Sequence, residues 1–271
     1  MLAIGGFDPE GGAGVVRDFL TARTLGAYVR MVPTAWTEQS PGGVRSVEPR
    51  DPAALEAAIR FALGRGVDET RVGGAGVAVK IGMVPNAEAA AAILAGLAAF
   101  RGPVVVDPVL ASSSGGALFA GDQAALLGLA ARAGLLTPNA GEAAALSGHP
   151  VGDLDAAAAA GRALCAQGVE AVLVKGGHIA GDEAVDVLVS TLGAGTPDAG
   201  ERRFAGPRID GPPVRGTGCA LATAIAVGLA RGAGLVRAIA EAKAWLATQL
   251  ARPEPAGGEW HLPTAGRAGS P

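Results

Sequence analysis

The segment with the clearest chemical potential is Arg215-Gly216-Thr217-Gly218-Cys219, which opens a stretch rich in alanine. Glycines at this spacing let backbone N–H groups converge, and the start of a helix adds a partial positive charge. The combination predicts a site for a phosphoryl group or an oxyanion. An ordinary glycine-rich turn before a helix explains the string equally well. It is not the Walker A pattern, because no Gly-Lys-Ser/Thr follows.

Cys219 falls in the first turn of that predicted helix. A helix N-terminus lowers the pKa of a thiol, so we expect a thiolate that takes a proton from a substrate hydroxyl near neutral pH. A small buried residue of the core is the alternative. Cys165 has apolar neighbours on a predicted helix and is assigned to the core. Two cysteines make no disulfide scaffold.

Two further groups could hold a phosphorylated ligand. Lys175 ends an apolar run and precedes two glycines, so its ammonium can reach a phosphate as a point charge. A strand-end lysine that only extends to solvent is the alternative. Asn139 and Glu142, three residues apart across a predicted helix start, could both face one Mg²⁺ or its waters. The same spacing is that of an N-cap with a supporting glutamate.

Short apolar runs alternate along the chain with alanine- and leucine-rich stretches of helical spacing. Strands are predicted at 2–4, 29–32, 77–81, 104–106, 135–137, 171–174 and 185–189. Helices are predicted at 15–25, 52–63, 87–100, 122–131, 154–167, 219–230 and 235–251. The alternation favours an α/β fold with a mostly parallel sheet and helices on both faces. Such sheets bind ligands at the carboxyl ends of their strands, where several of the candidate residues fall.

The body of the chain is expected to be one domain over residues 1–251, because it contains no linker long enough to divide it. Residues 252–271 are rich in proline, glycine and alanine and have no periodicity. They are predicted to form a mobile tail.

The composition excludes several classes of protein. Of 271 residues, 49% are hydrophobic, which predicts a buried core and argues against disorder. A net charge of −3 argues against nucleic acid as the main partner. The N-terminus lacks the pattern of a signal peptide, and no apolar run is long enough to span a bilayer. We therefore expect a soluble cytoplasmic protein with reduced thiols and no membrane partner.

Lysine is rare in this chain. Among 22 basic residues the only lysines are Lys80, Lys175 and Lys243. Coding bias explains the excess of arginine, and it makes each retained lysine more informative than usual.

Taken together, these residues resemble the hydroxymethylpyrimidine/phosphomethylpyrimidine kinases of thiamine biosynthesis, a branch of the ribokinase-like superfamily. The resemblance runs from about residue 2 to 251. The cysteine after Gly218 is its most specific detail, because most ribokinase-like sugar kinases carry aspartate there. The matching segments are GGFDPEGGAGVVRDFLTARTLGAY, TAWTEQSPGGVRSV, KIGMV, VVVDPVLASSSGGALF, LLTPNAGEAAAL, VLVKGGH and RGTGCALATAIAVGLARG.

The resemblance implies a three-layer α/β/α fold, a homodimer, and phosphoryl transfer from ATP with Mg²⁺ to a small aminopyrimidine alcohol and then to its monophosphate. It implies that Cys219 is the general base, needed mainly for the first step because the monophosphate is already an anion. The implied anion hole is Gly216, Thr217, Gly218 and Cys219. The residues implied for the ATP phosphates are Lys175, Asn139, Thr217 and Gly218, and those implied for the metal are Asn139, Glu142 and Asp107. The pyrimidine is implied to lie near Gly6, Asp18, Thr37, Gln39, Met83 and Val109, with Gln39 pairing with the ring nitrogen and exocyclic amine.

The sequence departs from the family pattern beside the implied pyrimidine site. The family usually has a small or hydroxylated residue at Phe7 and a histidine at Arg215. The remaining unusual residues are Trp36, Glu38, Ser40 and Pro41. Repacking at equal volume explains the two aromatics, and a reshaped pocket is the alternative.

Two other functions stay open. A kinase of a related ring alcohol such as pyridoxine would use the same phosphate machinery. A non-catalytic pyrimidine-binding regulator would keep only the fold, and the joint presence of Lys175, Asn139, Glu142 and Cys219 argues against it. A dinucleotide-dependent oxidoreductase is disfavoured, because the glycines at 11–14 lack the G-x-G-x-x-G spacing.

Overall fold

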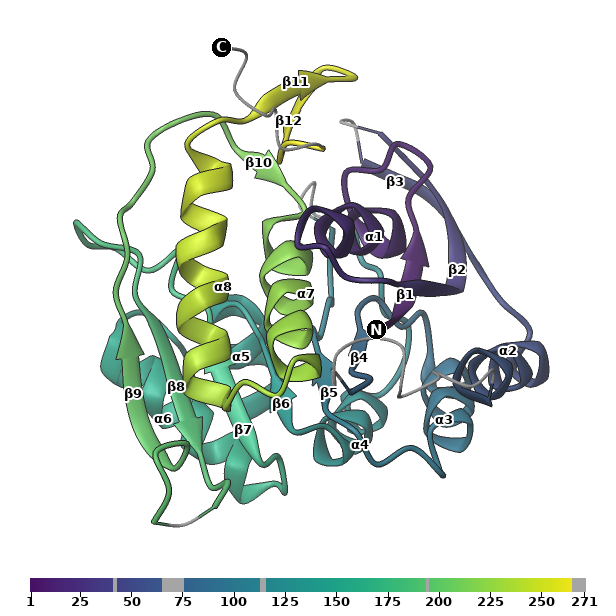
Figure 1. The fold of residues 1–271 in the computed structure, drawn as a ribbon, viewed down its shortest axis with the longest axis horizontal. Coiled ribbons are helices and arrows are strands. Elements are labelled where there is room, and N and C mark those ends of the chain that lie inside the picture. Colours follow the sequence, from purple (N-terminus) through teal and green to yellow (C-terminus); the bar gives the residue numbers. More distant parts are fainter. Residues whose placement is uncertain (41–42, 65–75, 113–115, 194, 265–271) are drawn as a thin grey trace.

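The computed structural model describes residues 1–40, 43–64, 76–112, 116–193 and 195–264. A nine-stranded sheet lies between two groups of helices (Figure 1), which confirms the predicted three-layer α/β/α architecture. The strands of this sheet are β1 (Leu2–Phe7), β2 (Arg30–Ser40), β3 (Gly43–Pro49), β4 (Val79–Ile81), β5 (Val104–Val106), β6 (Leu135–Leu136), β7 (Ala171–Val174), β8 (Asp186–Ser190) and β9 (Gly200–Phe204). The helices are α1 (Gly14–Thr24), α2 (Pro52–Gly64), α3 (Ala87–Gly96), α4 (Gln123–Arg132), α5 (Ala140–Ser147), α6 (Leu154–Ala166), α7 (Thr217–Ala230) and α8 (Leu235–Leu250).

The sheet is parallel in its centre and antiparallel at both sides. Its strand order is β3-β2-β1-β4-β5-β6-β7-β8-β9. The pairs from β2 to β7 are parallel, whereas β3 pairs antiparallel with β2, and β8 and β9 continue antiparallel from β7. The carboxyl ends of the central strands therefore share one edge, and the loops that follow them can meet there.

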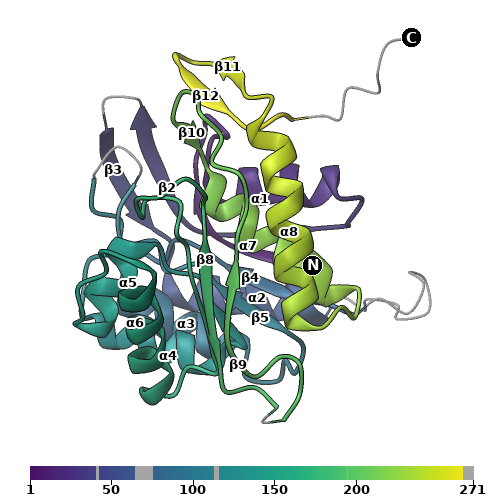
Figure 2. The same cartoon turned by 90° about the vertical axis from the view of Figure 1, so that its left-hand side faces the viewer.

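Both faces of the sheet are covered, which explains why its central strands are apolar at every position. In β5, Val104 and Val106 pack with helices α2 to α6, while Val105 packs with α7 and α8 on the other face. Helix α1 closes that second face beside α7 through a small cluster that includes Ala22 and Val227. Figure 2 shows the sheet between these layers. None of the helices in the described ranges is both long and apolar enough to cross a membrane.

The C-terminal segment departs from the predicted mobile tail. Strands β11 (Glu254–Ala256) and β12 (Glu259–His261) form an antiparallel hairpin. This C-terminal hairpin pairs parallel with β10 (Val214–Arg215), the two residues before the glycine-rich turn. Figure 1 shows it above α1 and beside the start of α7. Pairing between residues so distant in sequence leaves no local periodicity, so composition alone gave a wrong expectation for residues 254–261.

Candidate active site

The glycine-rich turn places the start of α7 directly against the loop that follows β1. Gly216 caps the helix with a positive φ of 73°. A Cβ atom built on it would lie 2.2 Å from the carbonyl oxygen of Gly12, so any side chain here would force the two segments apart. The predicted anion-hole residues Thr217, Gly218 and Cys219 form the first turn of α7 and are partly exposed. Their free N–H groups can therefore meet a ligand.

A second close approach joins the start of α1 to Cys219. Gly14 has a φ of 60°, and a Cβ atom on it would lie 2.1 Å from the carbonyl oxygen of Gly6. The backbone N–H of Gly14 hydrogen-bonds the Cys219 sulfur. The thiol is thereby held at the junction of the β1–α1 loop and α7.

Ionisable side chains from three neighbouring strand ends converge on this turn. The Lys175 ammonium lies 2.7 Å from Asp107 Oδ1 and 3.9 Å from Glu142 Oε2. Asn139 forms a parallel bridge with Lys175. A Cβ atom on Gly218 would lie 3.1 Å from the Lys175 nitrogen, which places that nitrogen against the first turn of α7. We call Asp107, Asn139, Glu142, Lys175 and residues 216–219 the charged end of the site.

The charges at this end stabilise one another. Burial opposes ionisation of Asp107, but the ammonium groups of Lys175 and Lys80 hold the pKa of that carboxyl below its ordinary value. Burial would lower the pKa of Lys175, and the carboxylates of Asp107 and Glu142 raise it instead. The Lys175–Asp107 pair is therefore ionised at neutral pH. Burial raises the pKa of Glu142.

Asn139 and Glu142 form a capping box at the start of α5. Asn139 Oδ1 accepts the Glu142 N–H at 2.9 Å, and Glu142 Oε2 accepts the Asn139 N–H at 2.7 Å. The capping alternative is thus confirmed, and the pair still lies within reach of Lys175. No group of three or more His, Cys, Asp and Glu side chains in the described ranges is arranged to hold a metal ion. A metal here would need further ligands from a bound phosphate.

Asp18 does not face the open side of the site. Its side chain is fully buried, and both of its oxygens lie 2.9 Å from the Lys80 ammonium. Thr223 of α7 donates a further hydrogen bond to it at 2.8 Å. Burial would lower the pKa of Lys80, but the Asp18 charge raises it. Asp18 therefore lies beneath the site, tied to a buried lysine.

The protonation state of Cys219 differs from the sequence prediction. Burial, together with the charges of Asp18 and Asp107, raises the pKa of the Cys219 thiol to about 11. The nearby Lys80 and the Gly14 N–H act in the opposite direction. The expected low pKa is wrong, because desolvation and two carboxylates outweigh the helix N-terminus. The resting side chain is a neutral thiol at pH 7.

The residues predicted for the pyrimidine lie at the other end of the site. Met83 belongs to a small buried cluster against which Val109 packs. A Cβ atom on Gly6 would lie 2.7 Å from the Met83 sulfur, so these residues adjoin. Thr37 Oγ1 donates to the carbonyl oxygen of Phe7 at 2.9 Å and accepts from Gln39 Nε2 at 3.2 Å. We call Gly6, Thr37, Gln39, Met83 and Val109 the Gln39 end of the site.

The two unusual aromatic residues contact each other. The rings of Phe7 and Trp36 pack edge to face with centroids 5.1 Å apart, and the two residues are register partners on β1 and β2. The Trp36 side chain is 48% exposed. This mutual contact supports repacking of the pair. Glu38 forms an exposed ion pair with Arg45, and Pro41 lies outside the described residues.

Two features next to the site have little or no local signal in the sequence. Lys80 supplies the buried charge beneath Cys219, and its only signal was the rarity of lysine. The C-terminal hairpin reaches the β1–α1 region: Arg17 donates to the carbonyl oxygen of Leu262 at 3.1 Å, and the His261 ring adjoins Gly12. Nothing local in the sequence marked the hairpin as part of the site.

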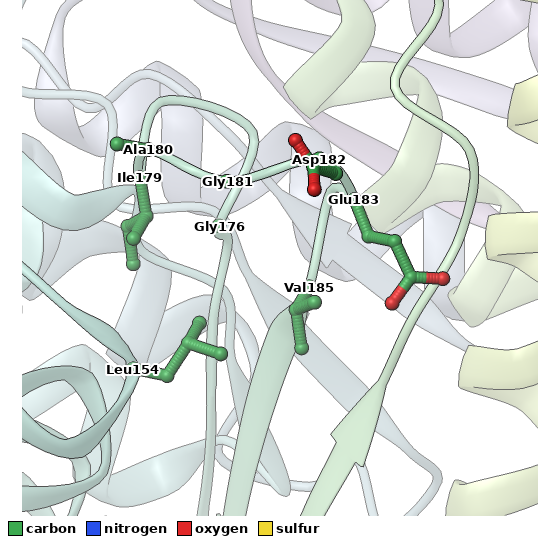
Figure 3. A pocket seen from close by; sticks show the side chains of 8 residues that line it. All are labelled: Leu154, Gly176, Ile179, Ala180, Gly181, Asp182, Glu183 and Val185. Atoms are coloured by element: carbon green, nitrogen blue, oxygen red, sulfur yellow. The ribbon is translucent and has the colours of Figure 1, made fainter.

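A small cavity opens beside the residue that follows Lys175. Its volume is about 250 Å³, and Figure 3 shows apolar Leu154, Ile179 and Val185 together with two carboxylates among its lining side chains. Arg208 fixes the loop over this cavity by hydrogen bonds to carbonyl oxygens of Gly177, Ile179, Gly181 and Glu183. None of the predicted site residues lines the cavity.

Comparison with known proteins identifies the relatives of this chain. The sequence profile of the family described as phosphomethylpyrimidine kinase matches residues 8–265. The hydroxymethylpyrimidine/phosphomethylpyrimidine kinase of Rhizobium meliloti (strain 1021) is 41% identical over 248 residues, which cover 90% of this chain and 88% of that protein.

Solved structures agree with this result. The phosphomethylpyrimidine kinase of Clostridium difficile 630 superposes with a TM-score of 0.72 at 30% identity, covering 91% of this chain and 97% of that one. An ADP complex of Bacillus subtilis pyridoxal kinase superposes with a TM-score of 0.80 at 26% identity, covering 96% and 95%. The chain belongs to the phosphomethylpyrimidine kinase family.

Proposed function

We propose that this protein transfers phosphoryl groups from ATP to 4-amino-5-hydroxymethyl-2-methylpyrimidine and then to its monophosphate, giving the diphosphate used in thiamine biosynthesis. The protein is a phosphotransferase of the hydroxymethylpyrimidine/phosphomethylpyrimidine kinase type. The observation that carries the proposal is the convergence of Lys175, Asp107 and the first turn of α7. Phosphoryl transfer depends on this kind of positioning and charge neutralisation rather than on covalent chemistry.

The charged end suits a nucleotide triphosphate. The free N–H groups at the start of α7 and the Lys175 ammonium offer donors and positive charge to phosphate oxygens. Lys175 is held in place by Asp107, so little reorganisation is needed when phosphate oxygens approach. Asn139, which forms a backbone bridge with Lys175, is assigned to the same phosphates.

Carboxylates at this end suit Mg²⁺ as well. Asp107 and Glu142 are buried within reach of Lys175, and Asn139 adds an amide oxygen. One or two carboxylates together with substrate phosphates make up a usual magnesium site. When bound, the metal would supply charge neutralisation on the transferred group. Asp107 and Glu142 would hold it through their carboxylate oxygens or through water.

The Gln39 end suits a small flat ring. Met83 and Val109 supply apolar walls, and the absence of a side chain on Gly6 lets Met83 pack directly against its backbone. The Gln39 amide can accept a hydrogen bond from an exocyclic amine and donate one to the adjacent ring nitrogen. Asp18 contributes from beneath by holding Lys80.

Cys219 receives the hydroxyl proton of the alcohol in the first phosphorylation. Its pKa of about 11 means that little thiolate is present at pH 7. A neutral thiol has no site for a second proton, so the acceptor is the thiolate, which forms when the thiol first gives its own proton to solvent. In a loose transition state the nucleophile keeps its proton until late, so a small fraction of thiolate is enough for the transfer. The second substrate is already an anion and makes no such demand.

A homodimer in the cytoplasm is part of this proposal, as the family resemblance implies. The β3 side of the sheet has no further strand in the described ranges, and Met31 and Trp36 expose large apolar surfaces on the adjacent β2. Light scattering of the purified protein tests the dimer.

A phosphorylation assay with Mg²⁺ and ATP tests the function. The pyrimidine alcohol, its monophosphate and pyridoxine are offered side by side, with products identified by mass. Formation of monophosphate and then diphosphate from the pyrimidine is expected. Turnover of pyridoxine alone would keep the mechanism but assign the protein to the activity of its pyridoxal kinase neighbour. Binding without any turnover would indicate the regulatory alternative.

A further inference from the structure

Arg215 connects the two ends of the site. It is the residue before the Gly216 cap, and its side chain is only 8% exposed. Its guanidinium contacts Glu259 of the C-terminal hairpin at 2.5 Å and the carboxylates of Asp8 and Glu10 at 3.4 and 3.6 Å. It also donates from Nη2 to Gln39 Oε1 at 3.0 Å. One buried side chain thus joins β10, β12, the β1–α1 loop and the end of β2.

The anchors of Arg215 are themselves fixed. Asp8 accepts backbone N–H groups of Glu10 and Ala13 at 3.1 and 2.9 Å, so its carboxylate cannot turn freely. Glu259 lies in β12, which pairs with β10 beside Arg215. A planar guanidinium held on two sides by carboxylates has little rotational freedom. The Nη2 nitrogen, which contacts both Asp8 and Gln39, therefore donates to Gln39 in a defined direction.

This direction decides which way the Gln39 amide faces. A guanidinium carries only donors, so the oxygen of the amide must face Arg215 and the nitrogen must face away. The rest of the chain of hydrogen bonds has the same polarity: Gln39 Nε2 donates to Thr37, and Thr37 donates to the Phe7 carbonyl oxygen. Reversal of the amide would break its contact with Arg215, and Thr37 could donate to the reversed oxygen only by leaving the Phe7 carbonyl.

We propose that Arg215 is a positioning residue that selects the ring substrate by fixing the Gln39 amide. This inference rests on the proposed function. The fixed amide keeps one acceptor lone pair on Oε1 and one N–H on Nε2, and together they match a ring with an amino donor beside a ring-nitrogen acceptor. A 4-oxo ring presents the opposite pattern, an acceptor beside an N–H donor. The reacting hydroxymethyl group must face Cys219, so such a ring cannot turn over to compensate.

The test compares the aminopyrimidine alcohol with its 4-oxo analogue in wild type, Arg215→Met and Arg215→Lys. Calorimetry without nucleotide gives the affinity of each ring, and the kinase assay gives kcat/KM for each. We expect Arg215→Met to reduce the preference for the amino ring over the oxo ring at least about tenfold, both in affinity and in kcat/KM. The reason is that a freed amide can turn to match either pattern of donors and acceptors. The KM for ATP should change little. Arg215→Lys keeps a cationic donor and should restore part of the ratio.

Glu259→Gln is the matched control. It weakens the contact of Arg215 with the C-terminal hairpin but leaves the donor to Gln39, so it should lower the melting temperature without changing the ring ratio. An unchanged ratio in Arg215→Met, with pyrimidine turnover intact in wild type, would overturn the inference and leave the proposed function standing. The opposite result is also possible: the wild type binds the amino ring selectively but turns over no substrate, and Arg215→Met abolishes the selectivity. That result would support the inference and refute the proposed function. Failure of wild type to prefer the amino ring in binding would also overturn the inference.

Discussion

The charged end and the Gln39 end of the site are built in different ways. At the charged end, Asp107, Asn139 and Lys175 each follow one of three adjacent parallel strands, β5, β6 and β7. At the Gln39 end, the polar contacts come from β1, β2, the β1–α1 loop, β10 and the C-terminal hairpin. The first end is set by the sheet itself. The second is set by side-chain hydrogen bonds between segments that are far apart in sequence.

Under the proposed function, this difference separates catalysis from selection of the substrate. Strand ends in a buried parallel sheet cannot shift without disturbing the core, so the charged end is rigid. If Arg215 fixes the Gln39 amide as proposed, one side chain controls the ring preference of the Gln39 end. Substitutions at the charged end should therefore reduce turnover of every substrate, whereas those at the Gln39 end should change which ring is used.

The largest effect is expected beneath the charged end. Lys80→Met leaves the fully buried Asp18 carboxylate without its cation, which costs about 3–5 kcal/mol of unfolding free energy. Urea denaturation measures the loss. Lys243→Met is the matched control, because its ion pair with Asp186 is closer to solvent, with 14% of the lysine side chain exposed. The double variant Lys80→Met/Asp18→Asn should recover much of the lost stability, because it removes the unpaired charge. Equal losses of stability in Lys80→Met and Lys243→Met would contradict the assigned role of Lys80 as the buried partner of Asp18.

Lys175→Ala should lower kcat/KM by about 10²–10³ for both phosphorylation steps, because a preorganised charge at the transferred group is removed. The ratio between ring substrates should stay as in wild type. Steady-state assays with the alcohol, the monophosphate and the 4-oxo analogue check both statements. A loss confined to one ring would remove the distinction between the two ends.

Cys219→Ala should slow the first phosphorylation by about 10²-fold, within the usual range for a proton-transfer group, and slow the second much less. Single-turnover assays started separately from alcohol and monophosphate measure the two steps. Equal losses in both would refute a proton-transfer role. Cys219→Ser keeps a small polar group and controls for packing.

The pH dependence of the first step should be set by the same thiol. The Cys219 pKa of about 11 lies above neutral pH, so the thiolate fraction rises tenfold with each pH unit below that value. If thiolate formation limits the rate, kcat/KM for the alcohol rises with pH through the neutral range, while that for the monophosphate does not. The rise should be absent in Cys219→Ala.

The smallest effect is expected at the Gln39 end. Gln39→Leu removes two hydrogen bonds to the ring and should raise its KM about tenfold, with the kcat and the KM for ATP nearly unchanged. Assays at varied ring and varied ATP concentration separate these parameters. A comparable fall in kcat would indicate that Gln39 also positions the reacting hydroxyl.

Much of the fold could be predicted from local sequence. The predicted strand ranges 104–106 and 171–174 coincide with β5 and β7, since buried parallel strands are uninterrupted apolar runs. Strand β9 was missed, because its sequence GERRF is polar and largely exposed. The capping box of Asn139 and Glu142 was recognisable because both of its bonds are local.

The sequence by itself determined the alternation of strands and helices, the glycines that let α7 approach the β1–α1 loop, and the placement of charged residues at strand ends. These depend on the periodicity and backbone freedom of neighbouring residues. Only the tertiary structure decided that Asp18 pairs with Lys80, that Cys219 is a neutral thiol, and that Arg215 holds Gln39 and the C-terminal hairpin. Each of these depends on burial and on charges brought together from distant segments, because desolvation and Coulomb interactions are set by distance in space rather than along the chain.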